Sequence, residues 1–230
     1  MSTWKFEQFL NNSSLFFPNA NKLTDQYEVS IPDYVMEMKR KELHKEGLRG
    51  RELEEEMASY FYITNPMKDL VLVNCWSVCP HESYALWKIY LSGEKNGIAI
   101  KSTVSKLRQV MNDSNDPNSE EYFIGRVKYK KHLNPDETNR LTIIATKKPF
   151  YDFENELRLF ILNYPLSEGG HIPPYDITIG RAVEIDVSSL ISEIYLSPFS
   201  DKEYRDEISD LLVQRGLSRK LIKESEIRDQ

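Results

Sequence analysis

The chain has 230 residues and a formal net charge of −6, with hydrophobic residues at 40% and aromatic residues at 11%. This composition can bury a core, so it excludes a chain that is disordered throughout. The acidic balance argues against a broad, sequence-independent grip on nucleic acid, which needs a basic surface, and leaves open only a local basic groove. Because no Pro/Gly/Ser-rich linker divides the chain, we expect one domain over residues 1–230.

The sequence carries no apolar run of about 18 residues, so it predicts no transmembrane helix and no membrane partner. Residues 1–6 lack the basic and then apolar layout of a signal peptide. We therefore expect a cytoplasmic protein.

The expected elements interleave helices and strands without a regular βαβ rhythm, which is typical of an α+β fold with a mixed or antiparallel central sheet and flanking helices. Strands are predicted at residues 15–18, 70–77, 98–101, 122–131, 153–162, 182–187, 193–196 and 221–227. Helices are predicted at residues 84–91, 103–111, 134–148 and 201–215, and a helical-hairpin insertion at about 33–63. Gly47 and Gly50 break that insertion into two helices, since glycine ends helices readily. Residues 4–10 are a short mixed segment, and residues 112–120 and 164–178 are loops.

Residues 153–162 contain the main candidate site. With a period of two, Glu154, Glu156 and Arg158 fall on one face of a strand, and the residues after them are apolar on both faces. That pattern favours a strand inside a sheet. Charges are rarely placed there unless they are paired or used, so these three side chains are the candidate catalytic groups.

Cysteine and histidine spacing predicts no metal site. Cys75 and Cys79 are the only cysteines and have no second pair, so we expect two reduced thiols in or near a core. The histidines are scattered without ligand spacing, at His44, His81, His132 and His171. His171 lies in the Pro/Gly-rich loop predicted at 164–178.

An aromatic pair on the helix predicted at 84–91 is the second candidate site. Trp87 and Tyr90 are three residues apart and so share a helix face. Their rings offer a surface on which a base or a nicotinamide ring can stack, or they pack the helix against the sheet. The sequence leaves both alternatives open.

Short motifs along nearly the whole chain resemble a widespread bacterial family, the domain of unknown function 2971. In chain order they are residues 4–6 with 15–18, 25–28, 75–77, Trp87 with Tyr90, 97–100, 127–129, Lys147 or Lys148 before Tyr151 and Phe153, the Glu154-x-Glu156-x-Arg158 signature, and 194–198. The family usually has an Asn-Asp-Pro-Phe-like segment where this chain has residues 24–28. The resemblance suggests a bacterial accessory or defence-associated protein.

A looser resemblance suggests a reaction. ADP-ribosyltransferases place a polar residue on a first strand, an aromatic residue on a second and a catalytic glutamate on a later one. Lys5, Phe16 or Phe17, and Glu156 or Glu154 follow that order here. The resemblance implies that a glutamate stabilises the oxocarbenium charge that develops when the nicotinamide–ribose bond of NAD breaks. Arg158 would hold a pyrophosphate or fix the carboxylates.

Three functions follow from these residues. The first is an NAD- or nucleotide-directed transferase or glycohydrolase, in which NAD is a substrate, Glu156, Glu154, Arg158 and Lys5 are catalytic, and Trp87, Tyr90 and Phe17 contact the nucleotide. The second is a non-enzymatic ligand-sensing or protein-interaction module, in which Glu154, Glu156 and Arg158 form a structural ion network. The third is a nuclease whose glutamates hold Mg²⁺, which the acidic charge disfavours.

Overall fold

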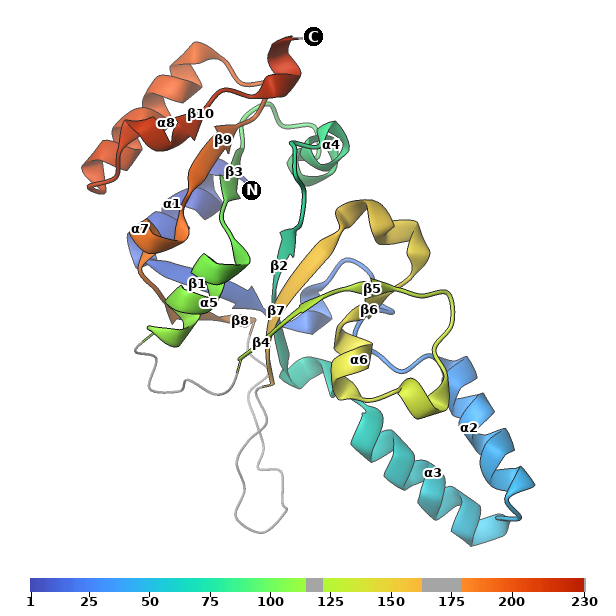
Figure 1. Cartoon of the computed structure of the whole chain (residues 1–230). Coiled ribbons are helices and arrows are strands. Elements are labelled where there is room, and N and C mark those ends of the chain that lie inside the picture. The colour runs from blue at the N-terminus through green and yellow to red at the C-terminus, as the bar shows by residue number, and fades with distance from the viewer. Residues whose placement is uncertain (115–121, 163–178, 230) are drawn as a thin grey trace. The chain divides into compact units, whose positions relative to one another are not determined.

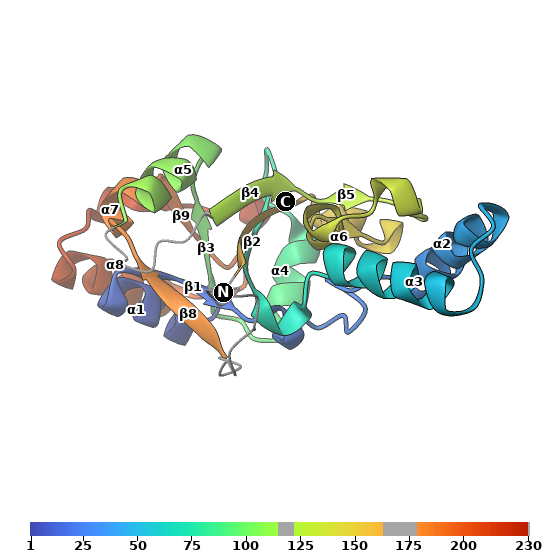
Figure 2. The same cartoon turned by 90° about the horizontal axis from the view of Figure 1, so that it is seen from below.

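The computed structural model describes residues 1–114, 122–162 and 179–229 (Figures 1 and 2). The chain divides into two compact units. Unit 1 comprises Met1–Phe16, Cys79–Ser119 and Ala182–Gln230, and unit 2 comprises Phe17–Val78 and Glu120–Arg181. Compact units of one chain can belong to one domain or to two, so the expected single domain stays a prediction. Among the described residues, no helix has the length and apolar character that crossing a bilayer requires.

Unit 1 is built around a mixed three-stranded sheet in which β9 is central. Its strands are β3 (Ile98–Lys101), β9 (Glu193–Leu196) and β10 (Ile222–Lys223), and β9 is antiparallel to β3 and parallel to β10. Its helices are α1 (Thr3–Asn12), α4 (Tyr84–Leu91), α5 (Val104–Asn112), α7 (Val187–Leu190) and α8 (Lys202–Gln214). β1 (Ser14–Pro18) pairs with β8 (Gly180–Glu184), and the unit boundaries fall inside these two strands.

Unit 2 is built around an antiparallel sheet in which β7 (Glu156–Leu162) lies between β2 (Val71–Ser77) and β4 (Tyr122–Arg126). Beside it, β5 (Lys128–Tyr129) and β6 (Thr146–Lys147) form a short parallel pair. The helices are α2 (Asp33–Lys45), α3 (Gly50–Thr64) and α6 (Arg140–Ile144), and the 3₁₀-helices are η1 (Ala20–Lys22), η2 (Lys68–Leu70), η3 (Pro135–Glu137) and η4 (Pro149–Glu154).

The α+β class and the helical hairpin are confirmed. α2 and α3 pack together through a small cluster of buried side chains, Leu43, Leu53 and Met57. Gly47 between them and Gly50 at the start of α3 have φ values of 101° and 53°, a region that glycine enters without a steric penalty. The break between the two helices therefore follows directly from the sequence.

Several predicted segments differ from the structure. The strand predicted at 122–131 is divided into β4 and β5, and the one predicted at 221–227 pairs only over β10 before a 3₁₀-helix, η6 (Glu226–Asp229). Residues 4–10 belong to helix α1, which begins after Ser2, whose hydroxyl accepts a hydrogen bond from the Lys5 amide. Residues 134–148 do not form one helix but pass through η3, α6 and β6. Asn139 caps a new helix there, and the β-branched residues that follow it favour a short helix and then a strand.

A cluster of core side chains in unit 2 lies on the face of β7 that carries Phe160. Its buried side chains are Ala20, Val29, Val71, Val73, Ile144 and Phe160, and the ring of Phe123 stacks on that of Phe160 at 5.2 Å between centroids. The predicted loop at 164–178 with His171, and most of the loop at 112–120, lie outside the described residues.

Candidate functional site

The side chain of Arg158 is the centre of a buried ion network in unit 2. Arg158 lies in β7 opposite Cys75 on β2 and Gly125 on β4, and it is 1% exposed. Its Nε and Nη2 donate to the two carboxylate oxygens of Glu156 at 2.7 and 2.9 Å. Nη2 also donates to Glu28 at 2.8 Å, and Nη1 donates to the carbonyl oxygen of Ile144 at 2.7 Å. The guanidinium is therefore held on three sides by oxygen.

Lys147 is the second cation of the network. Its Nζ lies 2.9 Å from Oε1 of Glu28, 2.6 Å from Oε2 of Glu154 and 3.7 Å from Oε2 of Glu156. The ring of Tyr151 covers it at 4.5 Å from Nζ to the centroid. Glu28 thus bridges the two cations, one oxygen to each, and Glu156 also lies within 4 Å of both. We call the five residues Glu28, Lys147, Glu154, Glu156 and Arg158 the ion network.

The ion network is charge-matched apart from one excess carboxylate. Three carboxylates and two cations give a net charge of −1. Burial by itself raises the pKa of Glu156, but the hydrogen bonds and charge of Arg158 outweigh it and hold that pKa below the ordinary value. Burial likewise lowers the pKa of Lys147, but Glu154 and Glu28 outweigh it and raise that pKa. The charged forms are therefore the stable ones.

The ion network is continuous with the apolar core of unit 2. Ile144, whose carbonyl oxygen accepts from Arg158, is itself a fully buried core residue. Val29 follows Glu28 directly, and Phe160 follows Arg158 on the same face of β7. Glu28 and Arg158 are thus placed beside residues of the core.

Residues 153–155 are not strand, contrary to the prediction. Glu154 ends η4, and Asn155 takes a left-handed conformation with φ of 41° before β7 starts at Glu156. The side chain of Asn155 donates to the carbonyl oxygen of Val78, and the Val78 amide donates to the carbonyl oxygen of Asn155 at 2.8 Å. Glu154 therefore reaches Lys147 from a turn, whereas Glu156 and Arg158 share a strand face as expected.

The predicted site residues divide between the two units. Glu154, Glu156 and Arg158 meet in unit 2, and Phe17, also in unit 2, is completely buried. The other three belong to unit 1: Lys5 is exposed on α1, Tyr90 is 59% exposed on α4, and Trp87 is buried and donates from Nε1 to Glu82 at 3.0 Å. Cys75 and Cys79 are free and exposed, contrary to the expected position in or near a core. Cys79 lies beyond the end of β2 at Ser77, whereas Cys75 lies within β2 opposite Arg158.

Sequence reasoning did not assign Glu28 and Lys147 to the site. Both lie outside the strand pattern that singled out Glu156 and Arg158, and Glu28 is 130 positions from Arg158. The available signal was the family resemblance, because residues 25–28 and Lys147 each belong to one of its motifs. Those motifs, distant in the sequence, come together in the ion network.

The ion network has little capacity for proton transfer or metal binding in this arrangement. A general base needs a carboxylate within reach of a substrate proton, whereas both oxygens of Glu156 accept from Arg158 and the residue is 5% exposed. The ammonium and guanidinium groups occupy the positions at which a cation would bind. Over the described ranges, no three His, Cys, Asp or Glu side chains are placed to hold a metal ion.

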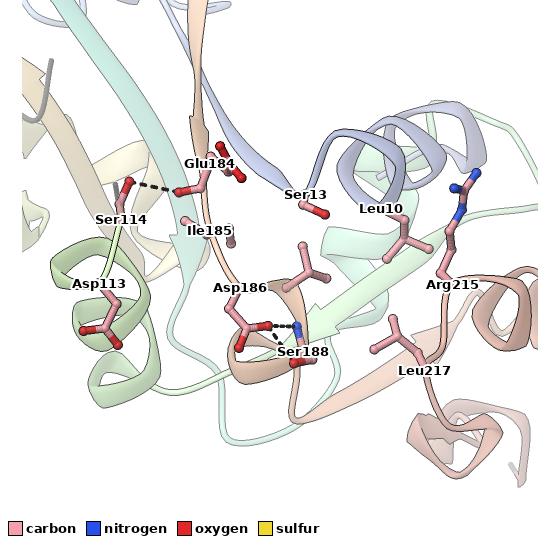
Figure 3. Close-up of a pocket in the computed structure, with 11 residues that line it drawn as sticks. Leu10, Ser13, Asp113, Ser114, Glu184, Ile185, Asp186, Ser188, Arg215 and Leu217 are labelled. Carbon is pink, nitrogen blue, oxygen red and sulfur yellow. Dashed lines mark hydrogen bonds between the residues drawn. The ribbon is translucent and has the colours of Figure 1, made fainter. Parts of the chain in front are cut away.

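Unit 1 contains a separate pocket of about 470 Å³, within the range of small-molecule sites (Figure 3). Its lining combines apolar and polar groups: Leu10, Ser13, Asp113, Ser114, Glu184, Ile185, Asp186, Val187, Ser188, Arg215 and Leu217. Asp186 caps α7 by accepting from the amides of Ser188 and Ser189, and hydrogen bonds from these two serines lower its pKa to about 2. The pocket thus contains a carboxylate that stays ionised at any physiological pH.

Neither a family model, nor a curated protein, nor a solved structure gives a significant match to this chain. The resemblance to the domain of unknown function 2971 therefore stays a prediction.

Proposed function

We propose that this protein is a non-enzymatic ligand-binding module in which the ion network holds unit 2 together. The observation that carries the proposal is the bidentate pairing of Glu156 with a 1% exposed Arg158. A catalytic carboxylate must face its substrate, and this one faces a guanidinium. Removing one partner of a buried ion pair strongly destabilises a fold, because the other charge is left uncompensated in the interior.

The pocket of unit 1 supports the ligand-binding part of the proposal. Its volume suits a small molecule, and its apolar side chains lie beside serine hydroxyls, three carboxylates and Arg215. Most small-molecule pockets place a few polar groups in an apolar lining, whereas most residues of this lining are polar or charged, so the ligand that we propose is a polar one. The proposal therefore separates a structural centre in unit 2 from a ligand site in unit 1.

The proposal also includes membership of the bacterial domain of unknown function 2971 and a cytoplasmic location. Four of the motifs that carry the resemblance contribute to the ion network or its neighbours: residues 25–28, 75–77, Lys147 and the Glu154-x-Glu156-x-Arg158 signature. A network built from separate motifs gives those motifs one shared physical purpose.

A second candidate is the NAD- or nucleotide-directed enzyme, with Glu154 in place of Glu156 as the catalytic carboxylate. The side chain of Glu154 is 16% exposed, more than that of any other member of the ion network, and it lies at the end of a turn. Lys147 and the Tyr151 ring beside it would then contact the nucleotide. The Mg²⁺-dependent nuclease has less support, because cationic side chains already neutralise the same carboxylates.

The two candidate functions predict different effects of Glu156→Gln and Glu154→Gln on stability and on nicotinamide release. We expect purified wild-type protein to release no nicotinamide from NAD, and Glu156→Gln to lower the free energy of unfolding measured in urea. The enzyme would be the better candidate if wild-type protein released nicotinamide and Glu154→Gln abolished that release without lowering the free energy of unfolding. Full stability of Glu156→Gln would refute the structural purpose of the ion network.

A further inference from the structure

A short basic segment of unit 2 contrasts with the acidic chain around it. Residues 126–148 contain seven lysines and arginines and two acidic residues, a local charge of +5, whereas the whole chain carries −6. Such an asymmetry marks a surface for an anionic partner, because like charges are gathered only at an electrostatic cost.

The structure places most of these cations on one exposed face. The amide of Lys128 donates to the carbonyl oxygen of Ala145, and that of Lys130 donates to the carbonyl oxygen of Lys147, so β5 runs along β6 (Figure 1). Between them, the hydroxyl of Tyr129 accepts from the Glu156 amide and so points toward the ion network. Because neighbours on a strand alternate, Lys128 and Lys130 project away from the network.

Further cations extend this face in both directions. Lys131 and Lys148 are exposed and lie together, since Nζ of Lys148 donates to the carbonyl oxygen of Lys131 at 3.2 Å. At the other end, exposed Arg126 donates from Nη2 to the side chain of Asn155 at 2.9 Å, which joins the end of β4 to the end of η4. The charged groups therefore follow a line along β5 rather than a single cluster.

Two phenylalanines of η4 are exposed beside these cations. Phe150, two residues after Lys148, is 83% exposed, and Phe153, two residues before Asn155, is 46% exposed. Two acidic side chains accompany this surface: Asp152 lies between the two rings, and Glu137 forms an ion pair with Lys130 at 2.7 Å. An exposed aromatic ring contributes no free energy of burial to the fold. A ligand with a flat π-face can stack on such a ring and bury it.

We propose that this surface, formed by Arg126, Lys128, Lys131, Lys148, Phe150 and Phe153, binds a single-stranded polynucleotide. Cations that follow a line neutralise successive phosphates, and exposed rings stack on unpaired bases, which a duplex does not offer. These groups do not read the 2′-hydroxyl, so the shared chemistry is that of single-stranded RNA and DNA. This inference goes beyond the proposed function and uses none of the groups in the pocket of unit 1.

The test is fluorescence anisotropy with labelled oligo-U and oligo-dT of about 12 nucleotides, within the usual site size for such surfaces. With four exposed cations, we expect log K to fall with log salt with a slope of about −3, at about 0.7 per phosphate contact. Lys128→Gln with Lys131→Gln should make the slope shallower by about 1.4. Phe150→Ala should weaken binding roughly 5- to 150-fold, the loss of one stacked base.

Matched controls keep the outcome clear. Lys95→Gln with Lys220→Gln removes two exposed lysines of unit 1, and Phe61→Ala removes a half-exposed ring of α3, so neither should change affinity. Circular dichroism should show every variant folded. The proposal is overturned if wild type does not bind either oligonucleotide at about 50 mM salt, where such contacts are strong. It is equally overturned if a duplex binds as tightly as a single strand, or if Phe150→Ala binds like wild type.

Discussion

Glu28 and Arg158 are 130 positions apart in the chain and are joined by an ion pair of 2.8 Å in which both side chains are at most 6% exposed. The second oxygen of Glu28 binds Lys147, so one carboxylate links a loop near the N-terminus to β6 and β7. A contact between such distant segments forms only when the chain is folded, and its closure costs conformational entropy. The ion network therefore depends on the folding of three distant segments of unit 2: the loop at Glu28, β6 and β7.

Removing a cation should destabilise the protein more than removing a carboxylate. The ion network has a net charge of −1, which becomes −2 in Arg158→Met and 0 in Glu156→Gln. We expect Arg158→Met to cost about 3–5 kcal/mol, the usual loss when one partner of a buried pair is removed. Glu156→Gln should cost less, and urea unfolding followed by circular dichroism measures both. The reverse order would contradict the charge balance.

Lys147 and Lys148 are neighbours that should respond very differently to the same substitution. Lys147 binds three carboxylates with a side chain that is 9% exposed, whereas Lys148 is exposed. We expect Lys147→Met to cost about 3–5 kcal/mol and Lys148→Met to stay within about 0.5 kcal/mol of wild type. Equal urea midpoints for the two variants would mean that the ion network contributes nothing to folding.

Low pH should reduce the free energy of unfolding through protonation of Glu156. Its pKa in the folded state lies below the ordinary value, so the unfolded state takes up protons first as the pH falls. The stabilisation is complete above the ordinary carboxylate pKa of about 4.3 and is lost as the pH drops through the lowered folded-state pKa. The difference in unfolding free energy between wild type and Glu156→Gln should therefore be constant above about pH 5 and shrink below it. A difference that does not change with pH would contradict this assignment.

The pocket of unit 1 depends on the cap of α7. Asp186 accepts from the amides of Ser188 and Ser189, so Asp186→Ala should cost about 0.5–2 kcal/mol of unfolding free energy. Asp113 lines the same pocket at the C-terminal end of α5 and caps no helix N-terminus, which makes Asp113→Ala the control. We expect thermal unfolding to shift for the first variant only, and a shift of equal size for both would point to a general charge effect.

Local patterns determined much of the fold. The glycines at 47 and 50 marked the helical hairpin, and Thr103 marked the start of α5 by accepting from the Lys106 amide. The structure of residues 134–148 is harder to predict from the sequence. Their pattern favours one helix, but Pro135, the cap at Asn139 and a run of β-branched residues each favour a break. Helix α1 is short and its start depends on one serine, but Phe6, Phe9 and Leu10 have the i, i+3, i+4 spacing of a helix face, so its pattern was available in the sequence.

Only the part of the candidate site that lies on β7 could be predicted from the sequence. The two-residue alternation of a strand placed Glu156 and Arg158 on one face. Because charged side chains are rarely buried unless they are paired, these two residues became the centre of the predicted site. Glu28 and Lys147 reach that centre through tertiary pairing, for which no periodicity gives a signal. The turn at Asn155 depends on a left-handed conformation that asparagine adopts more readily than most residues, and it moved Glu154 out of the strand.

The most direct test of the structural purpose of the ion network is a double-mutant cycle of Glu156→Gln and Arg158→Met in urea unfolding. The double variant restores the net charge of −1, so we expect it to be more stable than Arg158→Met alone, with a coupling energy of about 1–3 kcal/mol. Losses that add to within about 0.5 kcal/mol would show two independent residues and contradict a network that stabilises the fold.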